Sequence, residues 1–120
     1  MNVSRLIWPL ERSGLRYTSF VFIPEPRSTV AQVMGKQILR SGTSVGAHYR
    51  EAARARSTAE FISKLEGGLQ ELEETIYWLE FITESEISSP ANLPSPTQEA
   101  KELNAILTTC VKNAKAKKKL

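Results

Sequence analysis

The sequence predicts an all-α fold, and three observations support this. Apolar residues recur at three- and four-residue steps through three long segments, the spacing that places side chains on one face of a helix. Helix-capping residues precede these segments, and a proline- and serine-rich stretch separates the last two. A chain of 120 residues with 41% hydrophobic and 24% charged residues has the composition of one globular domain. We expect a single domain over 1–120, with 1–12 and 115–120 poorly ordered.

The beginning of the chain does not predict one kind of element. Gly14 weakens a helix there, and the run TSFVFI at 18–23 is β-branched and aromatic. The residues alone suit a strand as well as a helix, and the element we place here is a short or irregular helix near 13–23.

A long helix is expected at 29–55, with Ser28 as its cap. The segment contains the small-residue stretch RSGTSVG, which could be a phosphate-binding loop. Helical spacing continues through it, and the lysine and serine or threonine that complete a phosphate loop are absent. A helix is therefore favoured, and its core-facing residues are Met34, Ile38, Ser41, Val45, Tyr49 and Ala52.

Two more helices are expected, at 58–86 and 96–114. A capping box, Ser57 to Glu60, opens the first, and Ser95 and Pro96 open the second. The lysine-rich run 115–119 is expected to fray into solvent. The core stripe of the first is Phe61, Leu65, Gly68, Leu72, Ile76, Leu79 and Thr83. That of the second is Ala100, Leu103, Leu107, Cys110 and Ala114.

Two of these helices carry more contact surface than a monomer needs. Glycines four residues apart, Gly42 and Gly46, allow close helix approach, and three aromatic residues lie away from the core stripe of 58–86. Either the N-terminal segment covers the aromatics, or a second copy does. We favour a homo-oligomer, and its expected interface residues are Leu39, Gly42, Gly46, Ala53, Tyr77, Trp78 and Phe81.

Four cations share the outward side of the 29–55 helix, with no acidic residue among them. Formal charge alternates in blocks: +5 for residues 1–60, −7 for 61–111 and +5 for 112–120. Such a stripe is either a solvated face or a set of phosphate contacts, and the pI near 9.2 suits the second. The candidate nucleic-acid-binding residues are Lys36, Arg40, Arg50 and Arg54.

The chain lacks the usual patterns of catalytic chemistry. His48 is the only histidine and Cys110 the only cysteine, so a disulfide within the chain is excluded and metal-ligand spacings are absent. Ser41 and Ser44 have no nucleophile elbow. We expect no enzyme, no cofactor and no metal. No membrane span or signal peptide is evident, and a cytoplasmic bacterial protein is expected.

Two motifs in combination resemble a known family. They are RSGTS-x-G-A-x-x-x-E-A at 40–52 and E-x-x-Y-W-L at 74–79. The chain is similar to small bacterial proteins encoded by intervening sequences of large-subunit ribosomal RNA, and to accessory variability proteins of diversity-generating retroelements. Two departures are His48, where the family usually has asparagine, and the short, irregular first helix.

The resemblance implies an up-and-down four-helix bundle that assembles as a pentamer. It also implies binding of RNA or DNA and of a reverse transcriptase through basic surfaces. We therefore expect a non-enzymatic homo-oligomer that binds nucleic acid, as an accessory to a reverse transcriptase. The alternative is a purely structural scaffold without nucleic-acid affinity. A small hydrolase is the weaker third hypothesis.

Overall fold

The computed structural model describes residues 29–84 and 94–119. Three helices and no strands form this part of the chain: α2 (Thr29–Ala53), α3 (Thr58–Glu84) and α4 (Pro94–Lys119). The all-α prediction is confirmed here. The helix expected near 13–23 lies outside the described residues.

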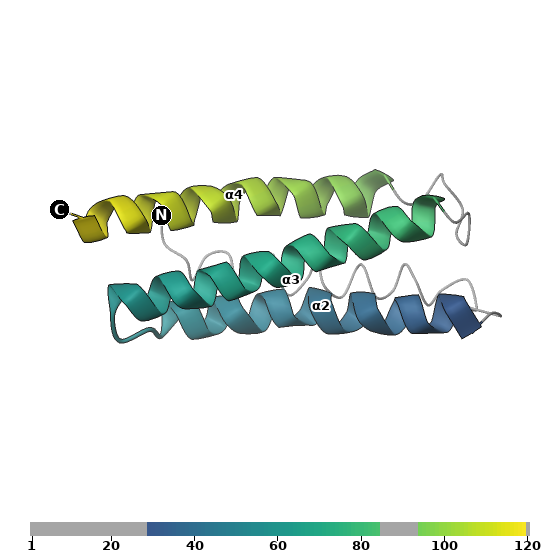
Figure 1. The fold of residues 1–120 in the computed structure, drawn as a ribbon, viewed down its shortest axis with the longest axis horizontal. Helices are drawn as coiled ribbons and strands as arrows, with labels where there is room; N and C mark the ends of the chain where they lie inside the picture. Colours follow the sequence, from purple (N-terminus) through teal and green to yellow (C-terminus); the bar gives the residue numbers. More distant parts are fainter. Residues whose placement is uncertain (1–28, 85–93, 120) are drawn as a thin grey trace.

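The three helices run side by side in alternating directions (Figure 1). α2 and α3 pack along most of their lengths, and α4 packs on α3. The molecule is elongated, with extents of 53 × 20 × 19 Å. α2 and α4 therefore end at the same end of the rod, where α3 begins.

Local hydrogen bonds explain where α2 ends and α3 begins. The backbone N–H groups of Arg54 and Ala55 donate to carbonyls three residues earlier, at 3.1 Å each, which tightens the last turn of α2. The Glu60 N–H then donates to Ser57 Oγ at 3.1 Å, so the predicted cap is confirmed. The Glu60 carboxylate in turn accepts a hydrogen bond from the backbone N–H of Arg56, one residue before the cap, at 3.1 Å.

The helix α4 is longer than the sequence analysis predicted at both ends. It begins at Pro94, where 96 was expected, and continues to Lys119 through the lysine-rich run that was expected to fray. Lysine is a good helix former, and positive charge is favourable near a helix C-terminus. These two effects account for the added turn.

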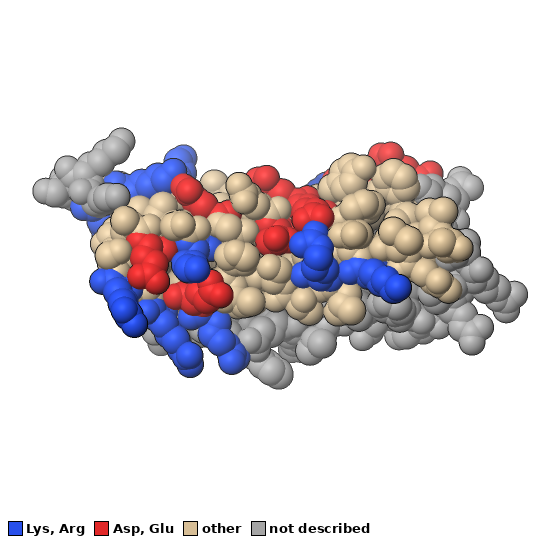
Figure 2. Space-filling view, turned by 60° about the horizontal axis from the view of Figure 1, so that its bottom comes forward, with Lys and Arg blue, Asp and Glu red and all other residues tan. Residues whose placement is uncertain are grey.

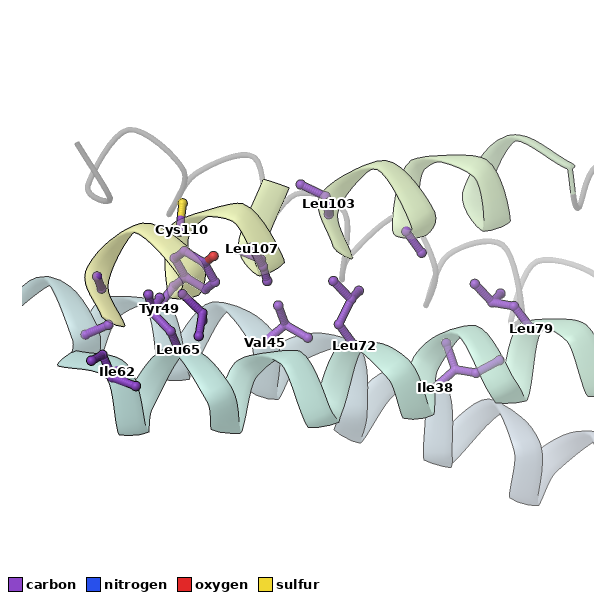
Figure 3. Close-up of a cluster of buried hydrophobic side chains, with 14 of the residues drawn as sticks. Ile38, Val45, Tyr49, Ile62, Leu65, Leu72, Leu79, Leu103, Leu107 and Cys110 are labelled. Atoms are coloured by element: carbon purple, nitrogen blue, oxygen red, sulfur yellow. The ribbon is translucent and has the colours of Figure 1, made fainter. Parts of the chain in front are cut away.

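The core lies between the three helices (Figure 3). All six residues of the predicted α2 core line are buried, as are the five of α4. In α3 the predicted Leu65, Gly68, Leu72 and Leu79 are buried, whereas Phe61 and Ile76 are half-buried. Full burial of each leucine contributes roughly 1.5–3 kcal/mol. Three buried α3 residues were not predicted: Ile62, Thr75 and Ile82.

Candidate functional site on the outer face of α2 and α3

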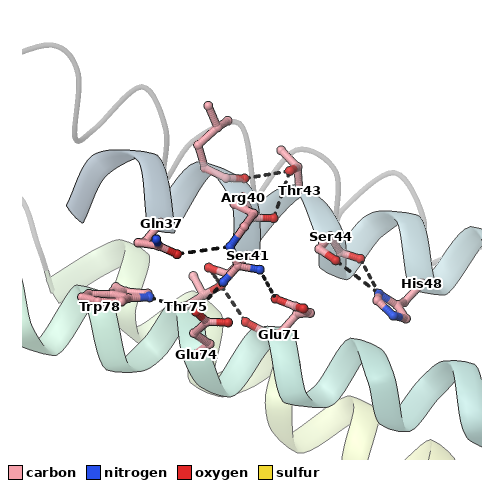
Figure 4. Close-up of polar contacts among 11 residues, drawn as sticks. Gln37, Arg40, Ser41, Thr43, Ser44, His48, Glu71, Glu74, Thr75 and Trp78 are labelled. Atoms are coloured by element: carbon pink, nitrogen blue, oxygen red, sulfur yellow. Dashed lines mark hydrogen bonds and ion pairs between the residues drawn. The ribbon is translucent and has the colours of Figure 1, made fainter. Parts of the chain in front are cut away.

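A polar network joins α2 to α3 on their outer face (Figure 4). Arg40 donates to Gln37 Oε1 and to Glu71 Oε2, at 3.1 Å each, and forms a second ion pair with Glu74. Trp78 Nε1 also donates to Glu74, at 3.2 Å. The Arg40 hydrogen bond lowers the pKa of Glu74, so this contribution to stability is present above about pH 4.5 and is lost as the pH falls further.

All four predicted nucleic-acid-binding residues are exposed: Lys36, Arg40, Arg50 and Arg54. No acidic residue of α2 lies among them, but Arg40 contacts two glutamates of the neighbouring helix α3. A projection of α2 alone contains no information about the neighbouring helix, and this is why those glutamates were missed. The binding role of the four cations stays a prediction.

The smallness of Ser41 follows from its partner on α3. Ser41 and Thr75 are both fully buried, and their Oγ atoms are 2.8 Å apart. The Thr75 hydroxyl also lies 2.9 Å from the carbonyl oxygen of Glu71, so both hydroxyls have partners. A larger residue at 41 would separate the two helices at this point.

A second close contact involves His48 and a glycine pair on α3. A Cβ atom on Gly67 would lie 2.6 Å from His48 Cδ2, and one on Gly68 would lie 3.4 Å from His48 Cβ. The His48 ring is oriented by a 2.9 Å hydrogen bond between its Nδ1 and the carbonyl oxygen of Ser44. Because a carbonyl oxygen can only accept, Nδ1 carries the hydrogen of this bond. Gly67 was not predicted to have a role, although a Gly-Gly pair inside a helical pattern can indicate a close contact.

The residues predicted to contact a second chain fall into two groups. Gly42 and Gly46 are buried within the single chain, whereas Leu39 and Ala53 are exposed. The aromatic residues form one cluster, with ring centroids 5.1 to 6.2 Å apart. Trp78 is half-buried against the core, and Tyr77 and Phe81 are 54% and 40% exposed. The assignment of these residues to a subunit interface stays a prediction.

Exposed apolar side chains gather where α2 begins and α3 ends. Val30 and Val33 are 56% and 50% exposed, and the contact of Ser41 with Thr75 places them level with the end of α3. Figure 2 shows this end, on the right, as a surface without charged side chains over much of its area. We call Val30, Val33, Tyr77 and Phe81 the apolar patch.

Comparison with known proteins identifies the family. The model for 23S rRNA-intervening sequence proteins matches residues 25–109. The chain belongs to this family. It is also similar to the crystal structure of a protein of unknown function from the S23 ribosomal protein family of Bacteroides thetaiotaomicron VPI-5482. That match has 34% identity and a TM-score of 0.76, and covers 92% of this chain and 95% of the other. No curated protein matches.

Family membership confirms one half of the resemblance, to the ribosomal RNA intervening-sequence proteins. The retroelement half stays a prediction. No group of three or more potential ligands that could hold a metal ion lies within residues 29–84 and 94–119. None of the helices in the same part of this intervening-sequence protein is long and apolar enough to cross a membrane.

The contact between His48 and Gly67 gives a prediction for stability. In a His48→Ala background, Gly67→Ala should stabilise α3 by about 0.5–1 kcal/mol through helix propensity. With His48 present, the new Cβ must displace the ring, and the same change should be less favourable by about 1 kcal/mol or more. Urea unfolding of the four proteins measures this coupling. Gly68→Ala is the control and should show little coupling, and additive effects at Gly67 would contradict the contact.

Proposed function

We propose that this protein is a non-enzymatic homo-oligomer that binds nucleic acid through its basic surface. The observation that carries the proposal is the exposure of Lys36, Arg50 and Arg54 on the outer side of α2, in a chain with a pI near 9.2. Phosphate contacts from exposed cations supply most of non-specific nucleic-acid affinity.

The proposed architecture is an up-and-down four-helix bundle whose first helix lies within 1–28. The apolar patch supports self-association, because large exposed apolar side chains at one end of the rod are stabilised by burial against a second copy. The resemblance described above favours a pentamer and a role as an accessory to a reverse transcriptase.

Reversing two cations of α2 should abolish most nucleic-acid binding. In Arg50→Glu/Arg54→Glu, two phosphate contacts are lost and two repulsions are added. Affinity for any duplex near 0.1 M salt should therefore fall by about 100-fold or more, regardless of sequence. Fluorescence anisotropy with labelled RNA and DNA duplexes at increasing salt measures the effect. If the unaltered protein binds neither duplex at low salt, the scaffold alternative replaces the proposal.

Charges introduced into the apolar patch should dissociate the oligomer. Tyr77→Glu/Phe81→Glu places two carboxylates on a surface that would be desolvated between subunits, and an unpaired buried charge is strongly unfavourable. Light scattering should report the mass of a single chain. The control Thr108→Glu/Thr109→Glu introduces the same charge on exposed positions of α4 and should leave the mass unchanged. An unchanged mass in the patch variant would exclude this surface as the interface.

The scaffold alternative has one specific observation in its favour. Arg40 is held by Glu71 and Glu74, so part of the α2 stripe already serves the contact between helices. A protein that uses its cations only in this way would keep its assembly and show no affinity for duplexes. The anisotropy and light-scattering measurements above separate these two functions.

A further inference from the structure

Ion pairs between helices define one end of the rod. Lys64 Nζ lies 2.9 Å from Glu51 Oε2 and joins α3 to α2, and Lys115 Nζ lies 2.7 Å from Glu66 Oε1 and joins α4 to α3. The last turns of α2 and α4 and the first turns of α3 therefore lie at the same level. We call residues 50–66 and 112–119 the basic end.

The basic end and the rest of the described chain have opposite net charges. The basic end contains nine Lys or Arg and three Glu, a formal net charge of +6. The remaining described residues contain three Lys or Arg and seven Glu, a net charge of −4. Figure 2 shows Lys and Arg side chains gathered at the left, where α2 ends and α3 begins. Folding has thus joined the end of the basic first block to the basic last block, which are separated in sequence by the acidic block.

Part of this positive charge is not paired within the described residues. All three acidic residues of the basic end are engaged: Glu51 and Glu66 in ion pairs, and Glu60 at the cap of α3. Four exposed cations at this end form no ion pair within the described residues; they are Arg54, Arg56, Lys112 and Lys117. The C-terminus of a helix carries roughly −0.5 charge, so two helix ends account for about one cation and not for a net charge of +6.

We propose that the basic end binds the phosphate backbone of a nucleic-acid duplex without reading its bases. This inference rests on the proposed function and specifies its site and its ligand. The rod is about 20 Å across, and that length of duplex presents roughly a dozen phosphate charges. Several cations can therefore contact phosphates at once.

The distribution of aromatic residues favours a duplex over a single strand. Proteins that bind single strands stack bases on exposed aromatic side chains. The exposed aromatics of the described chain, Tyr77 and Phe81, lie in the acidic half. Phe61 is the one aromatic residue of the basic end, and it packs against the core. Contacts at the basic end are thus limited to phosphates and sugars, which position a duplex without specifying its sequence.

The test neutralises three cations outside the α2 stripe, one just after the end of α2 and two on α4. Arg56→Gln/Lys112→Gln/Lys117→Gln removes three charges that only the fold brings together. Duplex affinity near 0.1 M salt should fall by about 100-fold or more, and the slope of log affinity against log salt should decrease by about three. Anisotropy is measured with a short RNA duplex, a DNA duplex of the same sequence, and one strand of each.

The comparison variant is Lys36→Gln/Arg40→Gln/Lys101→Gln, which removes the same charge outside the basic end, including two cations of the α2 stripe. If the basic end is the main site, this variant loses less affinity than the basic-end variant. Tighter binding of duplexes than of their single strands supports the proposal, and the tighter duplex identifies the nucleic acid. A loss in the comparison variant alone would move the site to the α2 stripe and leave the proposed function intact. Equal losses of duplex affinity in both variants would show that binding depends on the net charge of the protein and not on the basic end, and would overturn the proposal.

Three other results would also overturn it. Single strands that bind as tightly as duplexes would exclude duplex recognition. A changed mass of the basic-end variant in light scattering would make this surface a contact between copies. Failure of the unaltered protein to bind any duplex at low salt would remove the proposed function together with this inference.

Discussion

Ser41→Leu should lower the free energy of unfolding by roughly 2 to 4 kcal/mol, the sum of overpacking and of a lost buried hydrogen bond. Ser41 is fully buried, and its hydroxyl lies 2.8 Å from that of Thr75 across the contact between α2 and α3. The leucine side chain has two more non-hydrogen atoms than that of serine, at a point where the two helices are already in contact. Urea unfolding followed by circular dichroism measures the change.

Two related substitutions control this prediction. Ser41→Ala deletes only the hydroxyl, and Thr75 keeps the carbonyl of Glu71 as a partner, so the loss should be about 1 kcal/mol. Thr43→Leu places the same leucine on the exposed side of α2 and should change stability by less than about 0.5 kcal/mol. If Ser41→Leu were tolerated as well as Thr43→Leu, the small-residue stretch would not be explained by the contact with α3.

Helical periodicity was sufficient to predict α2, α3 and most of the core, because burial on one face is a property of a single helix. It could not identify Thr75, Gly67 or the glutamates that contact Arg40, because these depend on how two helices are aligned. The chosen glycines illustrate the limit. Gly67, against which the His48 ring packs, could not be singled out from the pattern of α3 alone. The predicted close approach of another helix to Gly42 and Gly46 stays a prediction.

The candidate site was predictable to a similar extent. The charge blocks were visible in the sequence, and the four α2 cations are exposed as expected. The basic end was not predicted from the charge blocks alone, because it depends on α4 returning along α3 until Lys115 reaches Glu66. The direction of α4 therefore converts two separate basic blocks into one surface, and places the acidic block and the apolar patch in the other half.

One buried polar group, the hydroxyl of Tyr49, has no hydrogen bond among the described residues to offset the loss of its hydration. Tyr49 is fully buried, and its hydroxyl has no hydrogen-bond partner within the described part of the chain. Figure 3 shows the hydroxyl on the same side of the core as Cys110. Burial, with a smaller contribution from Cys110, raises the pKa of Tyr49 well above its ordinary value of 10.0. The folded protein therefore keeps the phenol neutral at a pH where the unfolded chain ionises it.

Tyr49→Phe should raise the free energy of unfolding by about 1 kcal/mol at pH 7, because a buried unpaired hydroxyl costs roughly 1–3 kcal/mol. Above pH 10 the folded state binds more protons than the unfolded state, so the stability of the unaltered protein falls as pH rises, by about 1.4 kcal/mol per pH unit from this group. Phenylalanine removes that loss, and the stability advantage of the variant should widen between pH 10 and 11.

Urea unfolding at pH 7, 10 and 11 measures this advantage, with the exposed Tyr77→Phe as the control. A variant less stable than the unaltered protein at pH 7 would show that the Tyr49 hydroxyl has a stabilising partner in the folded protein.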